Sequence, residues 1–303
     1  MNKVFDWSEY WLNEGVTGEC FVDSKGNKNN YLSKFWYKEI RNNKNLAKVI
    51  DLASGAGSIF AGNIDEENDK YYAVDVSQDA LNQLKSRMPN VKTLVNSIDN
   101  VNLPSAEFDL VVSQFGIEYA GANAFIEAAR LLKANGKLVL LSHIKDGFID
   151  SKNQTEYEGV SLLNSSDFIN KSIEVTKARF EADKNKFKQK FSEFIAIEPV
   201  VSKWALTHKT GLLSHAYFGF RKMYENINSY VLADLIDWLE GINDEKQKSE
   251  IRLKEMLNAA LTQEKVESHC NLLRESGLFN IEFKPFLIPN QSLPIAWLIT
   301  GHK

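Results

Sequence analysis

Val49-Ile-Asp-Leu-Ala-Ser-Gly-Ala-Gly57 is the stretch that decides the fold of this chain. The run from Val49 to Leu52 is apolar except for one acid, which is typical of a buried parallel strand. The glycines that follow let the backbone turn sharply and approach a ligand closely, because they carry no Cβ. A helix starting at this turn would present free N–H groups at the same place. The stretch therefore predicts a small-molecule cofactor site.

A second acid, one strand further along the chain, indicates the kind of cofactor. Tyr71-Tyr-Ala-Val-Asp75 reads as the next buried strand, and Asp75 ends it about twenty residues after the glycine turn. A carboxylate with this spacing can bind the ribose hydroxyls of an adenosine group. We therefore expect Asp75 to be the ribose ligand.

The position three residues after Gly57 helps to separate two classes of cofactor. Nicotinamide and flavin sites usually carry G-x-G-x-x-G, in which the last glycine lets the helix pack closely on the strand beside the pyrophosphate. In this chain that position is Phe60. An aromatic side chain there favours an adenosyl ligand without phosphates, such as S-adenosylmethionine.

Several segments, in order and correctly spaced, make the chain resemble the class I S-adenosylmethionine-dependent methyltransferases. The resemblance covers the core from about Lys48 to Ile144 and resumes at the C-terminus. Ser113–Tyr119 and Leu141–Asp146 also resemble a type 11/12-like bacterial subgroup of the family, which is largely uncharacterised and supplies no substrate. The segments are the glycine motif Asp51–Gly57, the acid Asp75, the third-strand segment Ser97-Ile-Asp-Asn-Val-Asn-Leu-Pro104, and the fourth strand with its loop, Phe108-Asp-Leu-Val-Val-Ser-Gln-Phe-Gly-Ile-Glu-Tyr119.

The resemblance implies that the cofactor is S-adenosylmethionine, and it implies which residues hold it. Asp99, the acid ahead of Leu-Pro, would contact the adenine amino group, with Ile98 against the ring. Ala53 stands where the family commonly has glycine, a departure that a contact through the backbone can tolerate. The implied cofactor residues are Asp51, Ala53, Gly55, Gly57, Asp75, Val76, Ile98, Asp99 and Gln114.

Polar side chains that follow the fourth and fifth strands are the candidates for catalysis. Glu118 and Tyr119 follow the fourth strand, and His143 follows the fifth. A general base is needed only if the nucleophile must lose a proton. His143 is the first choice, because an ordinary imidazole titrates near neutral pH. The alternative is a histidine that is hydrogen-bonded for structure alone.

Strands and helices alternate from the glycine turn to residue 144, as in doubly wound α/β domains. The closing stretch, residues 277–301, resembles the terminal antiparallel hairpin of the family. We therefore expect an α/β fold with a Rossmann-like, doubly wound, seven-stranded sheet that ends in this hairpin. The expected strands cover residues 49–52, 71–76, 91–95, 108–113, 137–143, 280–288 and 295–300, with a helix over 122–133 that Asn135-Gly136 would end.

Between the fifth strand and the last helix, the pattern changes to long helical periodicity. From about Ser166 to Phe194, Ile173, Phe180 and Phe187 recur every seven positions, which predicts one long amphipathic helix. A segment that leaves the carboxyl edge of a sheet is well placed to cover a ligand site, so we expect a lid. The expected domains are an N-terminal aromatic-rich cap (1–47), the methyltransferase core (48–150 and 263–303) and the helical insertion or lid (151–262).

Composition and charge narrow the classes of function. A net charge of -4 and a pI of about 5.8 offer no basic surface for nucleic acid, and the lysines at 184, 186, 188 and 190 read as a solvated helix face. Cys20 and Cys270 lie far apart without metal-ligand spacing, so we expect no metal. The sequence shows neither a signal-peptide pattern nor a long apolar run, so we expect a cytoplasmic protein without membrane contact.

These observations predict an S-adenosylmethionine-dependent methyltransferase that transfers a methyl group to an oxygen or nitrogen nucleophile of a small-molecule substrate. A tRNA or protein methyltransferase is one alternative, and a module that binds the cofactor without catalysis is another. A homodimer is left open as an assembly. The sequence identifies neither the substrate nor the accepting atom.

Overall fold

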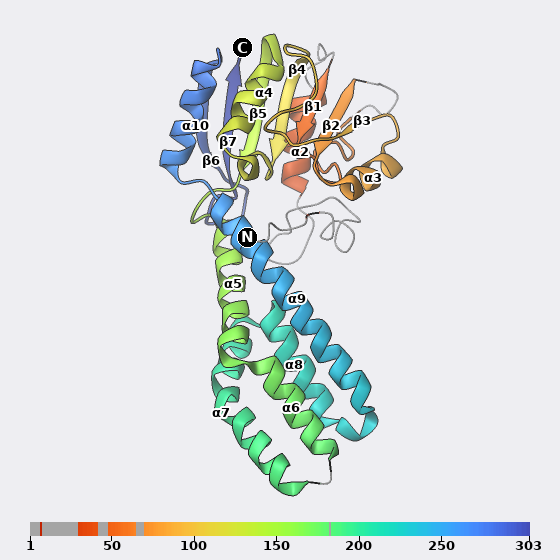
Figure 1. Cartoon of the computed structure of the whole chain (residues 1–303). Helices are drawn as coiled ribbons and strands as arrows, with labels where there is room; N and C mark the ends of the chain where they lie inside the picture. The colour runs from red at the N-terminus through yellow and green to blue at the C-terminus, as the bar shows by residue number, and fades with distance from the viewer. Residues whose placement is uncertain (1–6, 8–29, 42–47, 65–69, 182) are drawn as a thin grey trace. The chain divides into compact units, whose positions relative to one another are not determined.

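The computed structural model describes residues 7, 30–41, 48–64, 70–181 and 183–303. These residues fall into two compact units (Figure 1). The α/β unit lies within Asp6–Asp150 and Ala259–Lys303, and the helical unit comprises Ser151–Asn258. The chain passes from one unit to the other within the helices α5 (Phe148–Ser166) and α9 (Leu232–Ala259).

A seven-stranded sheet forms the α/β unit, as predicted, with the order β3-β2-β1-β4-β5-β7-β6. β7 is antiparallel to both of its neighbours, β5 and β6, whereas the other pairs are parallel. The strand order reverses between β1 and β4, and ligands in such sheets bind at the carboxyl ends beside this point. The strands are β1 (Val49–Leu52), β2 (Tyr71–Asp75), β3 (Lys92–Val95), β4 (Phe108–Gln114), β5 (Leu132–Ser142), β6 (Phe279–Phe286) and β7 (Ala296–His302).

Helices cover both faces of this sheet (Figure 1). Successive strand residues point to opposite faces, so Ile50 joins one buried apolar cluster and Val49 the other. Because both faces are covered, the central strands are apolar along nearly their whole length. The covering helices are α4 (Ala122–Leu131) and α10 (Gln263–Glu275) on one face, and α2 (Asn30–Arg41) and α3 (Gln78–Arg87) on the other.

The fifth strand begins earlier than the sequence predicts, and the helix before it ends earlier. Leu132 already pairs with Phe108 of β4, and the register then shifts before Lys137 pairs with Leu110. Asn135 has φ +65° inside this irregular stretch. The Asn135-Gly136 pair therefore lies in a bulge of β5 and does not end a helix. The residues directly after α4 already pair with β4, so the helix stops before this pair.

The long helix predicted over residues 166–194 is two helices in the structure. α6 (Phe168–Phe180) ends before α7 (Lys184–His208) begins, and the Asp183 side chain caps α7. Asp183 accepts hydrogen bonds from two N–H groups of the first turn, at 2.9 and 3.0 Å. The seven-residue spacing of apolar residues continues across the break. Phe180, the last residue of α6, is 44% exposed.

An aromatic cluster forms the core of the helical unit. The ring of Phe168 lies 5.8 Å from that of Phe194 and 5.9 Å from that of Phe220, measured between centroids. Burial of each such ring stabilises the unit by roughly 1.5–3 kcal/mol. The other helices of this unit are α8 (Leu212–Glu225) and the short 3-10 helix η3 (Ile227–Ser229). Its role as a lid stays a prediction.

In the segment before β1, the structure describes Trp7, α2 and Lys48. Trp36 of α2 is buried against the sheet, and α2 belongs to the α/β unit. The other residues of the predicted cap, including Tyr10 and Trp11, lie outside the described residues. Among the helices that the structure describes, none combines the length and the hydropathy needed to cross a bilayer.

Candidate active site

The glycine turn after β1 has the backbone geometry that only glycine adopts freely. Gly55 and Gly57 have φ values of +51° and +86°. A Cβ on Gly57 would lie 2.8 Å from a side-chain carbon of Leu84 and 2.9 Å from one of Met88. Residues 53–64 form successive turns in place of the expected helix. α3 is the first helix after β1, because the positive φ angles keep the intervening segment from winding regularly.

Ala53 adopts a left-handed conformation, with φ +57°, at the position where glycine is common in the family that the sequence resembles. This conformation costs roughly 1–2 kcal/mol for a residue with a Cβ. Gly116, after β4, makes room for the Ala53 methyl group: a Cβ on Gly116 would lie 2.5 Å from it. Sequence analysis noted Ala53 but missed Gly116, since their contact joins two loops far apart in the chain.

Asp75 lies at the end of β2 and is bonded to the glycine turn. Its Oδ2 accepts the Gly55 N–H at 2.8 Å, and its Oδ1 accepts the Ser77 N–H at 2.8 Å. Burial raises the pKa of Asp75, against the lowering effect of these backbone donors and that of Val76. Each carboxylate oxygen has a second lone pair, so the group can still accept a hydroxyl of a ligand.

Asp51 is a buried carboxyl group without a partner among the described residues. It is 1% exposed, and both of its oxygens lack a hydrogen bond. Burial, and then the charge of Asp75, raise the pKa of Asp51 well above its ordinary value. Two acids at one glycine turn suit a ligand that carries hydroxyl and cationic groups better than one that carries a pyrophosphate. The residues present therefore fit S-adenosylmethionine.

The residues expected around the adenine lie beyond β2 and β3. Val76 is 58% exposed, Ile98 is buried and Asp99 is exposed. The Asp99 Oδ1 accepts a hydrogen bond from the Ser97 hydroxyl at 2.5 Å. This loop is joined to the end of β2 by the Asn96 N–H, which donates to the Asp75 carbonyl at 3.0 Å. Ile98 and Asp99 thus come shortly after β3, whose last residue pairs with Asp75 of β2.

Gln114, at the end of β4, is held by two side chains that sequence analysis did not connect with it. The Trp36 Nε1–H donates to its Oε1 at 2.6 Å, and its Nε2 donates to the Ser58 hydroxyl at 3.1 Å. Trp36 therefore packs in the core of the α/β unit, with its indole N–H bonded to Gln114. The signal for this contact is weak, since 78 residues separate the two side chains.

Glu118 and His143 form a buried hydrogen-bonded pair beyond β4 and β5. The Glu118 Oε1 accepts the His143 backbone N–H at 2.8 Å and lies 2.6 Å from the ring Nδ1. A carboxylate only accepts, so Nδ1 carries the hydrogen and the Nε2 of a neutral ring presents a lone pair. The second oxygen, Oε2, is buried and has no hydrogen-bond partner among the described residues.

Aromatic rings surround the His143 imidazole. Phe115 lies 4.8 Å and Tyr119 5.9 Å from it, and Trp7 lies 5.3 Å from Tyr119, all measured between ring centroids. The structure thus brings the predicted residues Glu118, Tyr119 and His143 together. The described residues therefore place an imidazole and a carboxylate next to aromatic rings.

Comparison with known proteins agrees with this geometry. Residues 49–136 match the family model described as a methyltransferase domain. An uncharacterized methyltransferase of Schizosaccharomyces pombe is 30% identical over 115 residues, which are 38% of this chain. The match spans about half of that relative, 46% of its length.

Solved structures of methyltransferases are also similar to this chain. An S-adenosylmethionine-dependent methyltransferase from Mesorhizobium loti is 23% identical, covers 33% of this chain and 47% of its own, and has a TM-score of 0.30. Another, from Thermotoga maritima, is 12% identical, covers 90% of this chain and 92% of its own, and has a TM-score of 0.42.

The sheet order, the glycine turn and the family match together define the class of the α/β unit. It is a class I S-adenosylmethionine-dependent methyltransferase domain. S-adenosylmethionine is accordingly the cofactor that this domain takes. The bacterial subgroup suggested by the sequence stays a prediction.

Proposed function

We propose that this protein transfers the methyl group of S-adenosylmethionine to an oxygen or nitrogen nucleophile of a small-molecule substrate. The observation that carries the proposal is the Glu118–His143 pair at the same sheet edge as the glycine turn. Parallel strands β1, β2, β4 and β5 all end at this edge. A proton acceptor and a cofactor site are therefore built on one rigid support.

The cofactor would be held by the nine residues that the resemblance implies. Asp75 would accept the ribose hydroxyls, Asp99 the adenine amino group, and Ile98 would lie against the ring. Asp51 would satisfy a cationic or N–H-bearing group of the ligand. Ala53, Gly55, Gly57, Val76 and Gln114 would line the site. When bound, S-adenosylmethionine supplies an electrophilic methyl group on a sulfonium.

In this proposal His143 accepts the proton that the substrate nucleophile loses. Glu118 holds the imidazole through Nδ1, which leaves Nε2 on the opposite side of the ring to accept the proton. The Glu118 carboxylate then stabilises the charged imidazolium. Phe115 and Tyr119 exclude water around the ring, which keeps competing proton transfer out of the site. In this proposal Tyr119 also orients the substrate.

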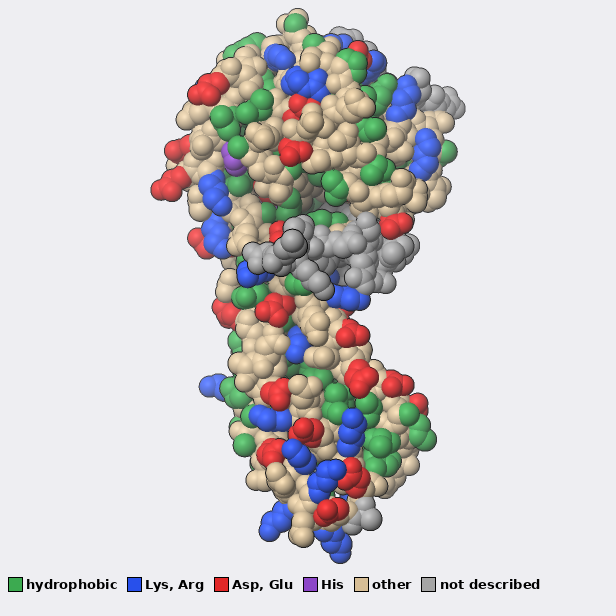
Figure 2. Space-filling view, viewed as in Figure 1, with side chains coloured by type: hydrophobic (Ala, Val, Ile, Leu, Met, Phe, Trp, Pro, Cys, Tyr) green, Lys and Arg blue, Asp and Glu red, His purple; other side chains and the backbone are tan. Residues whose placement is uncertain are grey.

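A small molecule is favoured over nucleic acid because two of the four lysines in the basic run on α7 are paired with acidic side chains. Lys186 pairs with Glu181 at 2.7 Å, and Lys190 pairs with Glu174 at 2.8 Å and with Glu193 at 3.0 Å. On the face seen in Figure 2, acidic and basic side chains of the helical unit are interspersed. Such a surface would not concentrate phosphates. The lid role of this unit, a cytoplasmic location and a homodimer belong to the proposal.

Incubation of the protein with methyl-labelled S-adenosylmethionine and cell extract tests the acceptor class. The extract is then split into small-molecule, RNA and protein fractions. We expect label in the small-molecule fraction. Label in RNA or protein would replace the small-molecule proposal, and tight cofactor binding without any transfer would support a non-catalytic module.

Variants of the base test the roles within the site once an acceptor is known. His143→Gln should lower kcat by about 100-fold and leave cofactor affinity unchanged. Glu118→Gln should lower kcat by about tenfold, because the amide no longer stabilises a charged ring. The control is His302→Gln. His302 lies on β7 opposite Lys137 of β5, away from the carboxyl end of β5 where His143 follows. Unchanged kcat in His143→Gln would remove the base from the mechanism.

A further inference from the structure

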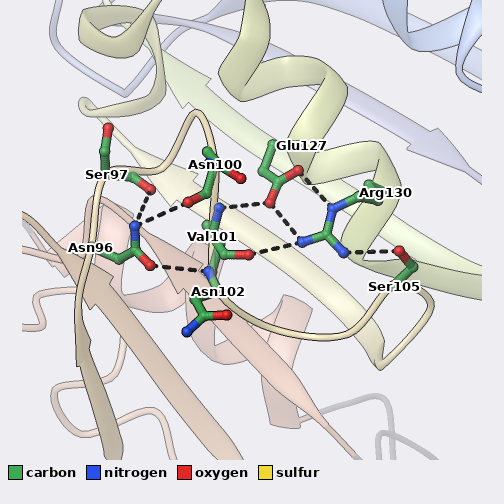
Figure 3. Close-up of polar contacts among 8 residues, drawn as sticks. All are labelled: Asn96, Ser97, Asn100, Val101, Asn102, Ser105, Glu127 and Arg130. Atoms are coloured by element: carbon green, nitrogen blue, oxygen red, sulfur yellow. Dashed lines mark hydrogen bonds and ion pairs between the residues drawn. The ribbon is translucent and has the colours of Figure 1, made fainter.

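The loop between β3 and β4 is held by side-chain hydrogen bonds to its backbone. It carries Ile98 and Asp99, the two residues proposed to contact the adenine. Figure 3 shows that hydrogen bonds hold the loop from two sides. One set comes from α4, and the other comes from Asn96 at the start of the loop.

Glu127 and Arg130 of α4 hold both backbone groups of Val101, two residues after Asp99. The Val101 N–H donates to the Glu127 Oε1 at 2.7 Å, and the Val101 carbonyl accepts from the Arg130 Nη2 at 3.0 Å. The two side chains form an ion pair at 2.6 Å. Arg130 also donates to the Ser105 hydroxyl at 2.8 Å. One ion pair therefore fixes the loop at two places.

Asn96 closes the loop from the other side. Its Nδ2 donates to the carbonyls of Ser97 and Asn100, at 3.1 and 3.0 Å, and its Oδ1 accepts the Asn102 N–H at 3.0 Å (Figure 3). Asp99 lies inside this ring of bonds. Its Oδ1 accepts the Ser97 hydroxyl, and the second carboxylate oxygen has lone pairs that could accept a hydrogen bond from a ligand.

The Glu127–Arg130 pair also balances the charge near Asp99. Glu127 is 7% exposed, and burial together with the Asp99 carboxylate would raise its pKa. The hydrogen bonds from Arg130 and Val101 outweigh these effects, so the pKa of Glu127 lies below its ordinary value. The Glu127 carboxylate therefore stays ionised beside Arg130. A carboxylate oxygen, such as that of Asp99, accepts a hydrogen bond from an amino group but has no hydrogen to donate to a carbonyl oxygen.

We propose that Glu127 and Arg130 are positioning residues that set the adenine specificity of the cofactor site by holding Val101, and with it the Asp99 carboxylate, in place. The inference rests on the proposed function, because it takes the loop to be the adenine contact. A hydrogen bond discriminates between ligands only when its acceptor is fixed to within a fraction of an ångström. Release of Val101 should therefore reduce discrimination more than it reduces affinity for the rest of the ligand.

The test compares two ligands in the same variant. S-adenosylhomocysteine carries the 6-amino group of adenine, and S-inosylhomocysteine carries a 6-oxo group in its place. Calorimetry gives the Kd of each for the wild type, Glu127→Ala, Glu127→Gln and Asp99→Asn. The ratio of the two Kd values is unaffected by partial unfolding, because both ligands report on the same folded fraction.

We expect the wild type to prefer S-adenosylhomocysteine by at least about tenfold. Glu127→Ala should reduce this preference by about fivefold or more, and Asp99→Asn should reduce it to about the same level. Glu127→Gln should retain part of it, because the amide oxygen can still accept the Val101 N–H. The matched control is Glu225→Gln, which breaks an Arg–Glu pair on α8 and should leave the ratio unchanged.

Three outcomes would overturn the inference, and they separate it from the proposed function. If Asp99→Asn loses the preference while Glu127→Ala keeps it within twofold, Glu127 is not a positioning residue and the cofactor site stands. If the wild type binds both ligands equally, the loop does not read the 6-amino group. If the wild type binds neither ligand, the proposed function fails together with this inference.

Discussion

The two units of the molecule treat their buried polar groups differently. In the described part of the α/β unit, Asp51 and Glu118 have buried carboxylate oxygens without a partner. In the described part of the helical unit, the corresponding atoms are the hydroxyls of Ser214 and Tyr224. A buried carboxylate without a partner costs more than a buried hydroxyl. Burial of these carboxylates therefore lowers the stability of the α/β unit more than burial of the two hydroxyls lowers that of the helical unit.

Two glycines, one in each unit, also differ in the space around them. Gly57 has φ +86° and has no space for a Cβ, whereas a Cβ on Gly241 of α9 would meet nothing within 4 Å. At the turn that is proposed to hold the ligand, Gly55 and Gly57 both have positive φ angles, and Gly57 is also closely approached by side chains.

The largest difference is expected between two glycine-to-alanine substitutions. Gly57→Ala should lower the free energy of unfolding by about 3 kcal/mol, because it adds backbone strain to a clash with Leu84 and Met88. Gly241→Ala should raise it by up to about 1 kcal/mol, because alanine favours a helix. Urea unfolding of both variants measures these effects. Similar destabilisation by both would remove the contrast between the units.

Asp51→Asn should stabilise the ligand-free protein and weaken cofactor binding. The folded-state pKa of Asp51 is raised, so the folded state binds more protons than the unfolded state between the ordinary and the raised pKa. Stability therefore falls as pH rises through this window, and the penalty is absent below the ordinary pKa. The gain from Asn should be small near pH 4 and about 2 kcal/mol at pH 8.

Urea unfolding at several pH values, combined with titration of S-adenosylhomocysteine, measures both effects of Asp51→Asn. The affinity should fall by about tenfold, because the ligand loses a charged partner. The control is Asp237→Asn on an exposed position of α9, which should change stability by less than about 0.5 kcal/mol at every pH. A loss of stability in Asp51→Asn at pH 8 would contradict the account of this group.

A smaller effect is expected for the contact between Ala53 and Gly116. Gly116→Ala should lower the free energy of unfolding by about 1–2 kcal/mol, because the new Cβ would lie 2.5 Å from the Ala53 methyl group. Ala53→Gly in the same chain should restore most of the loss, because it removes that methyl group and relieves the left-handed strain. A four-variant cycle of unfolding measurements gives the coupling. Additive effects would show that the two residues act independently.

The smallest effect is expected for a surface ion pair of the helical unit. Arg221 and Glu225 lie 2.7 Å apart with side chains that are 50% and 59% exposed. Glu225→Gln should change the free energy of unfolding by about 0.5 kcal/mol or less, because solvent screens the pair. Urea unfolding at low and high salt measures it. A change above about 1 kcal/mol would mean that this unit also depends on electrostatics.

Sequence analysis predicted the parts of the fold and site that local patterns encode. Local features of the sequence were enough for three predictions. An apolar run predicted the strand over 49–52, glycines predicted the turn at Gly55 and Gly57, and spacing predicted the acid at the end of β2. The prediction that Asp75 lies at this turn agrees with its bond to the Gly55 N–H. The assignment of individual ligand contacts stays a prediction.

Patterns along the chain could not supply the contacts between distant segments. Trp36 and Gln114 are 78 positions apart, and Val101 and Glu127 are 26 apart. Neither pair has a spacing that local rules recognise. The break between α6 and α7 was missed for another reason, because a seven-residue apolar spacing continued across it while the Asp183 cap was a single polar residue. Periodicity therefore predicted helices here but misplaced their ends.

The glycine turn and Asp75 are proposed to hold an adenosyl cofactor. The most direct measurement is a calorimetric titration of S-adenosylhomocysteine into the wild type and into Asp75→Ala, with folding of both checked by circular dichroism. The account predicts one site in the wild type and a loss of about 2 kcal/mol, roughly 30-fold in Kd, in Asp75→Ala. Absence of binding by the wild type, or equal affinity of the two proteins, would contradict it.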